Sequence, residues 1–215
     1  MLQSFSLPVW LAKLSIPRFF AAYGCRVLAI SVLFTGFTGL VKAAEKSQVN
    51  LPTVASVDLL RYAGTWYEVA RIPNFFQRKC TSDVSANYAP QPDGTITVTN
   101  RCRRADGEVD AVVGQARRPT VRGEPVAEEG KLEVRFAPRW LAFIPAVWGD
   151  YWVISLDPQY TMSLVGTPDR QYLWLLSRYP TVGADVVDEW LAKAQALGFD
   201  TANVVRAASP ADASD

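Results

Sequence analysis

The stretch that decides the fold is Gly64-Thr65-Trp66-Tyr67-Glu68-Val69-Ala70-Arg71 (GTWYEVAR). A glycine, which commonly marks a turn, precedes a short run rich in aromatic and apolar residues, the composition of a β-strand. Two further motifs follow it, Asp157-Pro158-Gln159-Tyr160 and Ser177-Arg178. The segments between the three motifs read as a series of short strands.

Turn residues separate eight candidate strands after residue 57. The turns carry Asp-Gly, Pro-Asp, Asp-Pro and Arg-Pro pairs, and residues 95–99 alternate between polar and apolar types, as in a sheet with one wet face. The predicted strands are 64–71, 83–88, 95–102, 110–117, 131–136, 151–156, 161–166 and 172–178. A short accessory strand over 203–206 is expected near the end of the chain.

One helix is predicted over 184–197. Val187, Trp190, Leu191 and Ala194 recur at helical spacing, and Gly198 supplies a stop. A single apolar stripe means that the helix lies against the sheet. Eight consecutive antiparallel strands close into an up-and-down barrel or stack as a two-sheet sandwich, and the strand pattern alone leaves both open.

The three motifs resemble those of the lipocalin family, in particular its bacterial and apolipoprotein D-like members. The resemblance also covers Tyr67–Arg71, the Gly-Thr-Pro-Asp-Arg stretch at 166–170 and the Tyr-Leu-Trp-Leu-Leu-Ser-Arg stretch at 172–178. It implies an all-β, eight-stranded antiparallel up-and-down barrel with one C-terminal α-helix packed outside. It further implies structural roles for five residues at the closed end: Gly64, Trp66, Asp157, Tyr160 and Arg178. There the Arg178 guanidinium is expected to lie across the Trp66 indole and exclude water from the floor.

Alternation along the strands then assigns side chains to the barrel interior. With Trp66 inside, Glu68 and Ala70 share its face, and Arg178 places Leu176, Trp174 and Tyr172 inside. The resemblance adds Tyr88, Trp152, Ile154 and Leu156. We expect six of these residues to contact a ligand: Glu68, Ala70, Tyr88, Trp152, Ile154 and Trp174. Glu68 is a carboxylate among aromatic residues and needs a hydrogen bond, for which Tyr88 or the ligand is the expected partner.

Two apolar loops are expected at the open end of the barrel. The first carries Phe75 and Phe76, and the fifth, residues 138–149, carries Trp140 and Phe143; all four are predicted ligand contacts. Large contiguous apolar patches on a protein surface indicate a binding partner or a membrane. We expect the fifth loop to contact a membrane or a second copy of the chain, as in a homodimer, unless it folds over its own pocket as a lid.

The first 43 residues are predicted to be a signal peptide. Residues 27–41 form an uncharged apolar run, too short to span a bilayer comfortably, with basic residues before it and Val41-Lys42-Ala43 after it. Cleavage is expected after Ala43; lipidation at Cys25 is the alternative, although Cys25 precedes the apolar run. The remaining boundaries are a linker over 44–56, the lipocalin domain over 57–206 and a flexible tail over 207–215. Export to the periplasm or the outer membrane follows.

An exported chain meets an oxidising compartment, which favours a disulfide between Cys80 and Cys102. These cysteines flank the turn signal Pro90-Gln91-Pro92-Asp93-Gly94, so a β-hairpin would bring them together. Two free buried thiols are the alternative.

Composition excludes several function classes. The chain has no histidine, the usual general base and metal ligand, so Ser-His or Cys-His pairs and ordinary zinc or haem sites are excluded; we expect no cofactor and no metal. The net charge of +1 gives no attraction to nucleic acid. Together with these exclusions, the resemblance to lipocalins implies a non-enzymatic carrier of a fatty acid or lysophospholipid for envelope maintenance. The alternatives are a carrier of another hydrophobe such as a pigment or quinone, a lipid isomerase using a lumenal thiol, and a structural protein with a packed interior.

Overall fold

The computed structural model describes residues 50–121, 124–125 and 130–207. The chain divides into two compact units, Met1–Lys46 and Ser47–Asp215, and the described residues belong to the second. The predicted signal peptide, Cys25, most of the linker and the end of the predicted tail lie outside the described residues. Within those residues, no helix has the length and apolar character needed to cross a bilayer.

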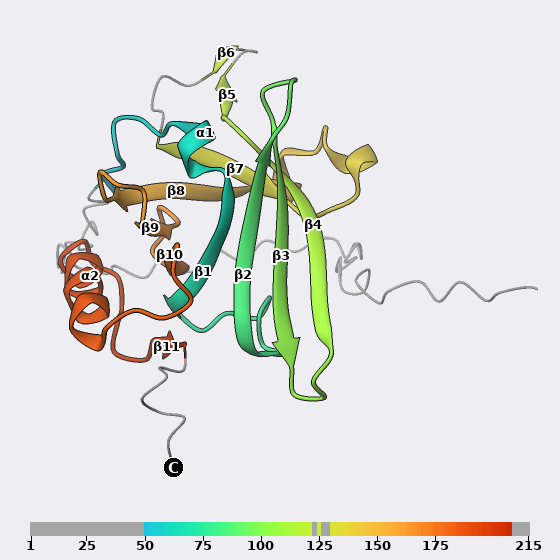
Figure 1. The fold of residues 1–215 in the computed structure, drawn as a ribbon. Coiled ribbons are helices and arrows are strands. Elements are labelled where there is room, and N and C mark those ends of the chain that lie inside the picture. Colours follow the sequence, from blue (N-terminus) through green and yellow to red (C-terminus); the bar gives the residue numbers. More distant parts are fainter. Residues whose placement is uncertain (1–49, 122–123, 126–129, 208–215) are drawn as a thin grey trace, which may run out of the picture. The chain divides into compact units, whose positions relative to one another are not determined.

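Eight strands form the wall of the molecule (Figure 1). They are β1 (Gly64–Arg71), β2 (Cys80–Pro90), β3 (Ile96–Arg104), β4 (Val109–Arg117), β7 (Lys131–Arg135), β8 (Gly149–Leu156), β9 (Met162–Gly166) and β10 (Leu173–Ser177). The remaining elements are short, except for the last helix: α1 (Leu59–Tyr62), β5 (Thr120–Val121), β6 (Glu124–Pro125), the 3-10 turns Arg139–Leu141 and Pro145–Val147, α2 (Ala184–Ala196) and β11 (Val205–Arg206).

The wall closes because β1 pairs with β10 as well as with β2. Every neighbouring pair is antiparallel, in the order β1-β2-β3-β4-β7-β8-β9-β10, so the predicted up-and-down barrel is confirmed. The short β11 pairs with the end of β1, at Ala70 and Arg71, where β2 no longer follows β1. The predicted accessory strand is therefore present over two of its four residues.

Two apolar clusters lie on opposite faces of this wall. The outer cluster joins α2, through Val187, Trp190, Leu191 and Ala194, to outward-facing residues such as Leu164 and Leu175. The predicted helix thus packs outside the barrel by its apolar stripe. The inner cluster lies inside the barrel and includes Trp66, Tyr88, Ile96, Val98, Ala116, Leu132, Val153, Val165 and Leu176.

Irregular register in two strands exchanges their inner and outer faces. In β1 the pairing with β10 shifts between Glu68 and Ala70, and in β8 the pairing with β9 shifts between Val153 and Ser155. An extra residue in one strand places the next side chain on the opposite face from the one that strict alternation assigns. Both shifts change which residues reach the interior.

The wall is incomplete between β4 and β7. β4 pairs with β3 from Val109 to Ala116, but with β7 only from Gln115 to Arg117. β7 ends at Arg135, and the chain leaves the wall before it reaches the end of the barrel where β4 begins. The lower parts of β2, β3 and β4 therefore extend beyond the rest of the barrel, as Figure 1 shows.

Candidate binding site in the barrel interior

The floor of the barrel is built around Trp66, whose side chain is fully buried. Its indole N–H donates to the carbonyl of Tyr62 at 2.8 Å. The Arg178 guanidinium lies 4.0 Å from the indole centroid and donates to the carbonyls of Arg61, Thr65 and Tyr160, at 2.7, 2.9 and 3.3 Å. This stack joins the start of β1 to the end of β10 and matches the arrangement expected from the motifs.

Gly64 starts β1 at φ +92°, a conformation that side chains with a Cβ rarely adopt. A Cβ at this position would also lie 3.4 Å from the Arg178 guanidinium. Both observations account for a glycine directly before the floor tryptophan.

The second motif forms the turn between β8 and β9 at the same end. The Asp157 carboxylate accepts hydrogen bonds from the backbone N–H groups of Gln159, Thr161 and Met162, and so holds the turn closed. The Tyr160 hydroxyl accepts from the backbone N–H of Asp58 at 3.0 Å, and the Arg61 guanidinium lies 4.0 Å from the Tyr160 ring. The three motifs therefore converge on one end, which closes the barrel.

A layer of three tyrosines lies directly above the floor. The hydroxyl of Tyr151 is 2.7 Å from that of Tyr88 and 3.1 Å from that of Tyr62, which in turn lies 3.0 Å from Ser163 Oγ. Burial raises the pKa of all three phenols above its ordinary value. The hydroxyls therefore stay neutral and satisfy one another in a region that excludes water.

The next layer holds a buried ion pair. The Glu68 carboxylate accepts from Arg71 at 2.6 Å and from the Gln77 amide at 2.5 Å, and the Gln77 carbonyl accepts from the Trp174 indole N–H at 2.9 Å. Burial raises the pKa of Glu68 above its ordinary value, although Arg71 and Gln77 act in the opposite direction. The predicted partner Tyr88 is not the one found; Glu68 is held by Arg71 and by the loop residue Gln77.

Arg71 reaches the interior because of the register shift in β1. It pairs directly with Trp174, whereas the predicted position Ala70 pairs with Leu175 and belongs to the outer cluster. One nitrogen of its guanidinium, Nε, is buried with no hydrogen-bond partner. The prediction that Ala70 faces the interior is therefore wrong, and sequence alternation misses Arg71.

Aromatic rings continue from this layer to the mouth. Tyr172 stacks on Trp174 at 5.9 Å between ring centroids, Phe76 lies 5.5 Å from Tyr172, and Phe75 lies 3.9 Å from Phe76. Phe75 and Phe76 are 51% and 60% exposed, so the series runs from the buried Glu68 layer to solvent. The loop that carries them is thus at the open end, as expected.

On β8 the predicted interior residues are partly reversed. Tyr151 pairs with the interior residue Leu132, which places Tyr151 and Val153 inside and Trp152 outside. Ile154 also belongs to the outer cluster beneath α2, and the register shift then returns Leu156 to the interior. The predictions for Trp152 and Ile154 are wrong, because the sequence gives no sign of the irregularity and the two faces of β8 are equally apolar.

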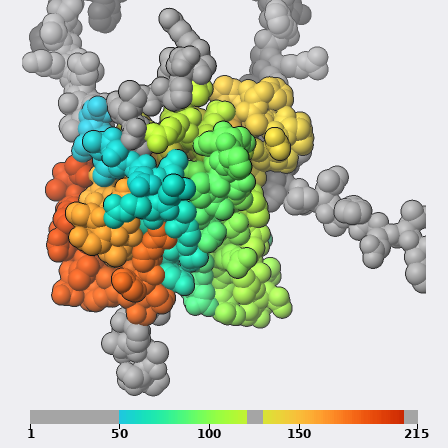
Figure 2. Space-filling model, turned by 45° about the horizontal axis from the view of Figure 1, so that its top comes forward, coloured from blue at the N-terminus to red at the C-terminus, as the bar shows by residue number. Residues whose placement is uncertain are grey.

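The fifth loop lies against the outer wall and does not cover the mouth. Trp148, at its end, has its ring 3.7 Å from the guanidinium of Arg117, which projects outward next to the inward Ala116. Trp140 and Phe143 are 71% and 80% exposed. Figure 2 shows the loop as a yellow lobe beside β4. This position does not agree with the prediction that Trp140 and Phe143 contact the ligand. It also does not agree with the alternative that the loop folds over the pocket as a lid.

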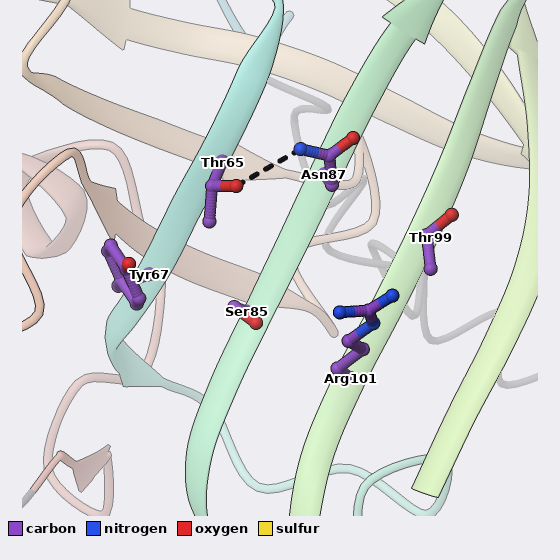
Figure 3. Close-up of a pocket in the computed structure, with 6 residues that line it drawn as sticks. All are labelled: Thr65, Tyr67, Ser85, Asn87, Thr99 and Arg101. Carbon is purple, nitrogen blue, oxygen red and sulfur yellow. Dashed lines mark hydrogen bonds between the residues drawn. The ribbon is translucent and has the colours of Figure 1, made fainter.

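A polar hollow lies on the outer face of β1, β2 and β3 (Figure 3). Its lining residues are Thr65, Tyr67, Ser85, Asn87, Thr99 and Arg101. Each alternates with an inward neighbour such as Trp66 or Val98, and Asn87 donates to Thr65 at 3.0 Å. This is the solvated face that the alternation at 95–99 predicts, and it is separate from the barrel interior.

Cys80 and Cys102 form the predicted disulfide, with a Cα–Cα distance of 5.5 Å. It joins the start of β2 to the end of β3 near the open end of the barrel. The alternative of two free thiols is therefore excluded for these residues. Among the described residues, no cluster of acidic or cysteine side chains could hold a metal ion.

Comparison with known proteins agrees with this architecture. The family model for the lipocalin-like domain matches residues 57–209. The chain is 38% identical to temperature-induced lipocalin-1 of Arabidopsis thaliana over 157 residues, covering 73% of this chain and 80% of that protein. It is 37% identical to the outer membrane lipoprotein Blc of Escherichia coli over 165 residues (75% and 84%), and 30% identical to apolipoprotein D of Macaca fascicularis over 175 residues (75% and 85%).

A solved structure also shares the fold. Insecticyanin from the tobacco hornworm Manduca sexta superposes with a TM-score of 0.57 at 20% identity, over 76% of this chain and 87% of that one.

Proposed function

We propose that this chain, which belongs to the lipocalin family, binds a fatty acid or a lysophospholipid in its barrel and acts as a carrier and not as an enzyme. The observation that carries the proposal is the series of rings formed by Phe76, Tyr172 and Trp174, which leads from the mouth to the buried Glu68–Arg71 pair. An acyl chain with ten buried methylenes gains about 8 kcal/mol, which corresponds to a dissociation constant of about 1 μM before ordering costs weaken it.

The polar head of the ligand is proposed to lie near Arg71. The arginine neutralises Glu68 and keeps Nε without a partner, so an anionic head can approach without facing an uncompensated carboxylate. Asn100 offers a second polar atom on the inner face of the wall: it pairs with the inward Ala86, and its buried carbonyl oxygen has no hydrogen-bond partner. A carboxylate or a phosphate would accept from Arg71 Nε, and a hydroxyl group of a lysophospholipid head would donate to the Asn100 carbonyl oxygen.

The test is a titration with the fluorescent fatty acid cis-parinaric acid. Asn100→Trp places a large ring on the inner face of β3, and we expect it to weaken binding at least tenfold. Its neighbour Thr99 faces outward, so Thr99→Trp is the matched control and should bind as the parent does. Equal binding by both variants would contradict a site inside the barrel.

A second titration addresses the head group. Displacement of the probe by oleate, by a lysophospholipid and by oleyl alcohol is compared in the parent, in Arg71→Gln and in Arg101→Gln, which lies on the outer face. We expect Arg71→Gln to weaken the binding of oleate selectively, whereas the binding of oleyl alcohol should be unaffected.

Native mass spectrometry of protein from its own cell would identify the natural ligand. A pigment or quinone found there would replace the lipid in the proposed function.

The non-enzymatic role is supported by the state of the cysteines. A lipid isomerase of this fold would need a free thiol in the interior, but Cys80 and Cys102 are bonded to each other. One reactive thiol in a titration of the purified protein would revive the enzyme class.

The fifth loop is proposed to contact the membrane while ligand is loaded. Trp140 and Phe143 are exposed beside Arg139, a combination suited to an interface with anionic lipid. We expect Trp140→Ser/Phe143→Ser/Ile144→Ser to lose association with phosphatidylglycerol vesicles. Leu60, which is 80% exposed at the closed end, supplies the control Leu60→Ser.

Export to the periplasm or outer membrane is proposed from three observations. These are the apolar run at 27–41, the disulfide, which persists in oxidising compartments, and the similarity to the outer membrane lipoprotein Blc of Escherichia coli. N-terminal sequencing and mass spectrometry would distinguish cleavage after Ala43 from lipidation at Cys25. An intact Met1 terminus would contradict both. A role in envelope maintenance follows from this location and is tested by deletion under membrane stress.

A further inference from the structure

The edge of β4 is open along most of its length. From Val109 to Gly114 the strand pairs with β3 on one side, whereas β7 joins its other side only from Gln115 onward. Among the described residues, no strand pairs with Val109–Val113 on that second side, whereas Arg135 of β7 and Phe136 lie against Gly114. A closed barrel normally removes such edges, because unpaired backbone N–H and C=O groups attract another strand.

This edge carries few of the features that protect exposed strands. The stretch Val109-Asp110-Ala111-Val112-Val113-Gly114 contains no proline, lysine or arginine, and Asp110 is its only charge. Val109 and Val113 are 57% and 62% exposed. Gly114 pairs with the inward Val98, so Asp110 and Val112, which alternate with the outer residues, also face the interior. Val109, Ala111 and Val113 therefore share the outer face. The outer face of the open edge is therefore apolar.

The disulfide keeps this edge extended. Cys102 pairs across the ladder with Asp110 and is bonded to Cys80, so β2, β3 and β4 are joined covalently or by hydrogen bonds along the projecting part of the sheet. An edge held in this way can accept a partner strand without first being ordered.

We propose that the partner is a second copy of this chain, which pairs with β4 antiparallel about a two-fold axis through Ala111. Symmetric pairing centred there brings Val109 opposite Val113 of the second copy, and the reverse. It joins five residues of each strand into a sheet continuous across both copies. A register centred on Val112 would bring Val109 opposite Gln115, which β7 already occupies, and would lose both valine pairs.

Charge complementarity supports the same register. Where β7 leaves the wall, a hollow is lined by Val113, Gly114, Arg135 and Arg139, among others. Continuing the pairing past Val109 brings Glu108 of the second copy opposite Gly114, at the rim of this hollow. The exposed Glu108 of each copy thus approaches the exposed Arg139 of the other, so the surface is self-complementary, as a two-fold interface requires.

The test measures the molar mass of the purified exported protein by light scattering coupled to size-exclusion chromatography. We expect a dimer at micromolar concentration and at least a tenfold increase in its dissociation constant for Val113→Lys. Val113 is exposed, so the melting midpoint should not change when both proteins are melted at a concentration low enough for both to be monomers. The control Thr99→Lys changes the outer face of β3, which has strands on both sides, and should leave the dimer intact.

Cross-linking tests the register. Residues opposite each other in an antiparallel pair have Cα atoms about 4.5–5.5 Å apart, within the range of a disulfide. Ala111→Cys should therefore form a covalent dimer under mild oxidation, whereas Asn87→Cys, on the outer face of β2, should not. A monomer at all concentrations would overturn the proposal, and so would a dimer that Val113→Lys leaves intact. A dimer abolished by Trp140→Ser/Phe143→Ser alone would assign the contact to the fifth loop and would also refute it.

Discussion

Removing the Arg178 guanidinium should destabilise the whole barrel, because this group joins three chain segments at the floor. It donates to three backbone carbonyls and lies on the Trp66 ring. Hydrogen bonds from a charged group contribute about 1.5–3 kcal/mol each, and a cation over an indole about 0.5–2 kcal/mol. Arg178 is only half-buried, so water would replace part of the lost bonding. We expect Arg178→Ala to lower the free energy of unfolding by about 3 kcal/mol.

The conservative variant separates charge from geometry. Arg178→Lys keeps a cation but can reach fewer carbonyls than the planar guanidinium, and we expect a loss of roughly 1–2 kcal/mol. Urea unfolding followed by far-ultraviolet circular dichroism measures both losses. Arg101→Ala, on the exposed outer wall, is the control and should stay within about 0.5 kcal/mol of the parent.

A loss below about 1 kcal/mol for Arg178→Ala would refute the reasoning, since the observed bonds would then contribute little beyond what water supplies. The tryptophan provides an independent check. Trp66→Ala removes a fully buried ring and should cost about 3–5 kcal/mol. Because the two side chains are in contact, the double variant should lose less than the sum of the single losses.

Three further predictions concern the interior and the disulfide. Burial raises the pKa of Glu68 in the folded state, so the folded protein binds this proton more tightly than the unfolded chain does. The protein therefore loses stability as the pH rises from the ordinary glutamate pKa through the raised pKa. Glu68→Gln should remove that part of the pH dependence of urea unfolding, and an unchanged pH profile would contradict this prediction. Opening the disulfide with Cys80→Ser/Cys102→Ser, with its sequence separation of 22, should cost about 3 kcal/mol, and an unchanged urea midpoint would contradict the estimate. A brominated fatty acid should quench the parent protein's fluorescence, and Trp174→Phe should remove more of that quenching than Trp152→Phe, because these side chains lie on opposite faces of the wall; equal losses would contradict that placement.

The sequence predicts the strands, the helix and the closed end well because their signals are local. Turn residues mark the ends of the strands, the apolar stripe of α2 has helical spacing, and the three motifs lie in order along the chain. The wall strands differ from the predicted ones by a few residues at their ends, where pairing with neighbours decides how far a strand continues. The disulfide was equally accessible, since both cysteines flank one turn.

Only the tertiary structure decides which side chains face the interior. Alternation assigns faces correctly as long as a strand is regular, as it does for Glu68, Tyr88 and Trp174. A single extra residue reverses the assignment, and the register shifts in β1 and β8 exchanged Ala70 for Arg71 and Trp152 for Tyr151.

The same limit applies to the surface of the barrel. The order of the strands predicts that the fifth loop lies at the open end of the barrel. β7 has only five residues, however, so the loop leaves the wall early and packs against its outer face. The same short strand leaves β4 with an open edge. The sequence by itself therefore determined the strands, the outer helix and the Trp66–Arg178 floor, because local periodicity, turns and the three motifs encode them, whereas the strand pattern left barrel and sandwich open. Register and strand length arise from pairing between segments distant in the chain, and these alone decided the interior lining and the free edge.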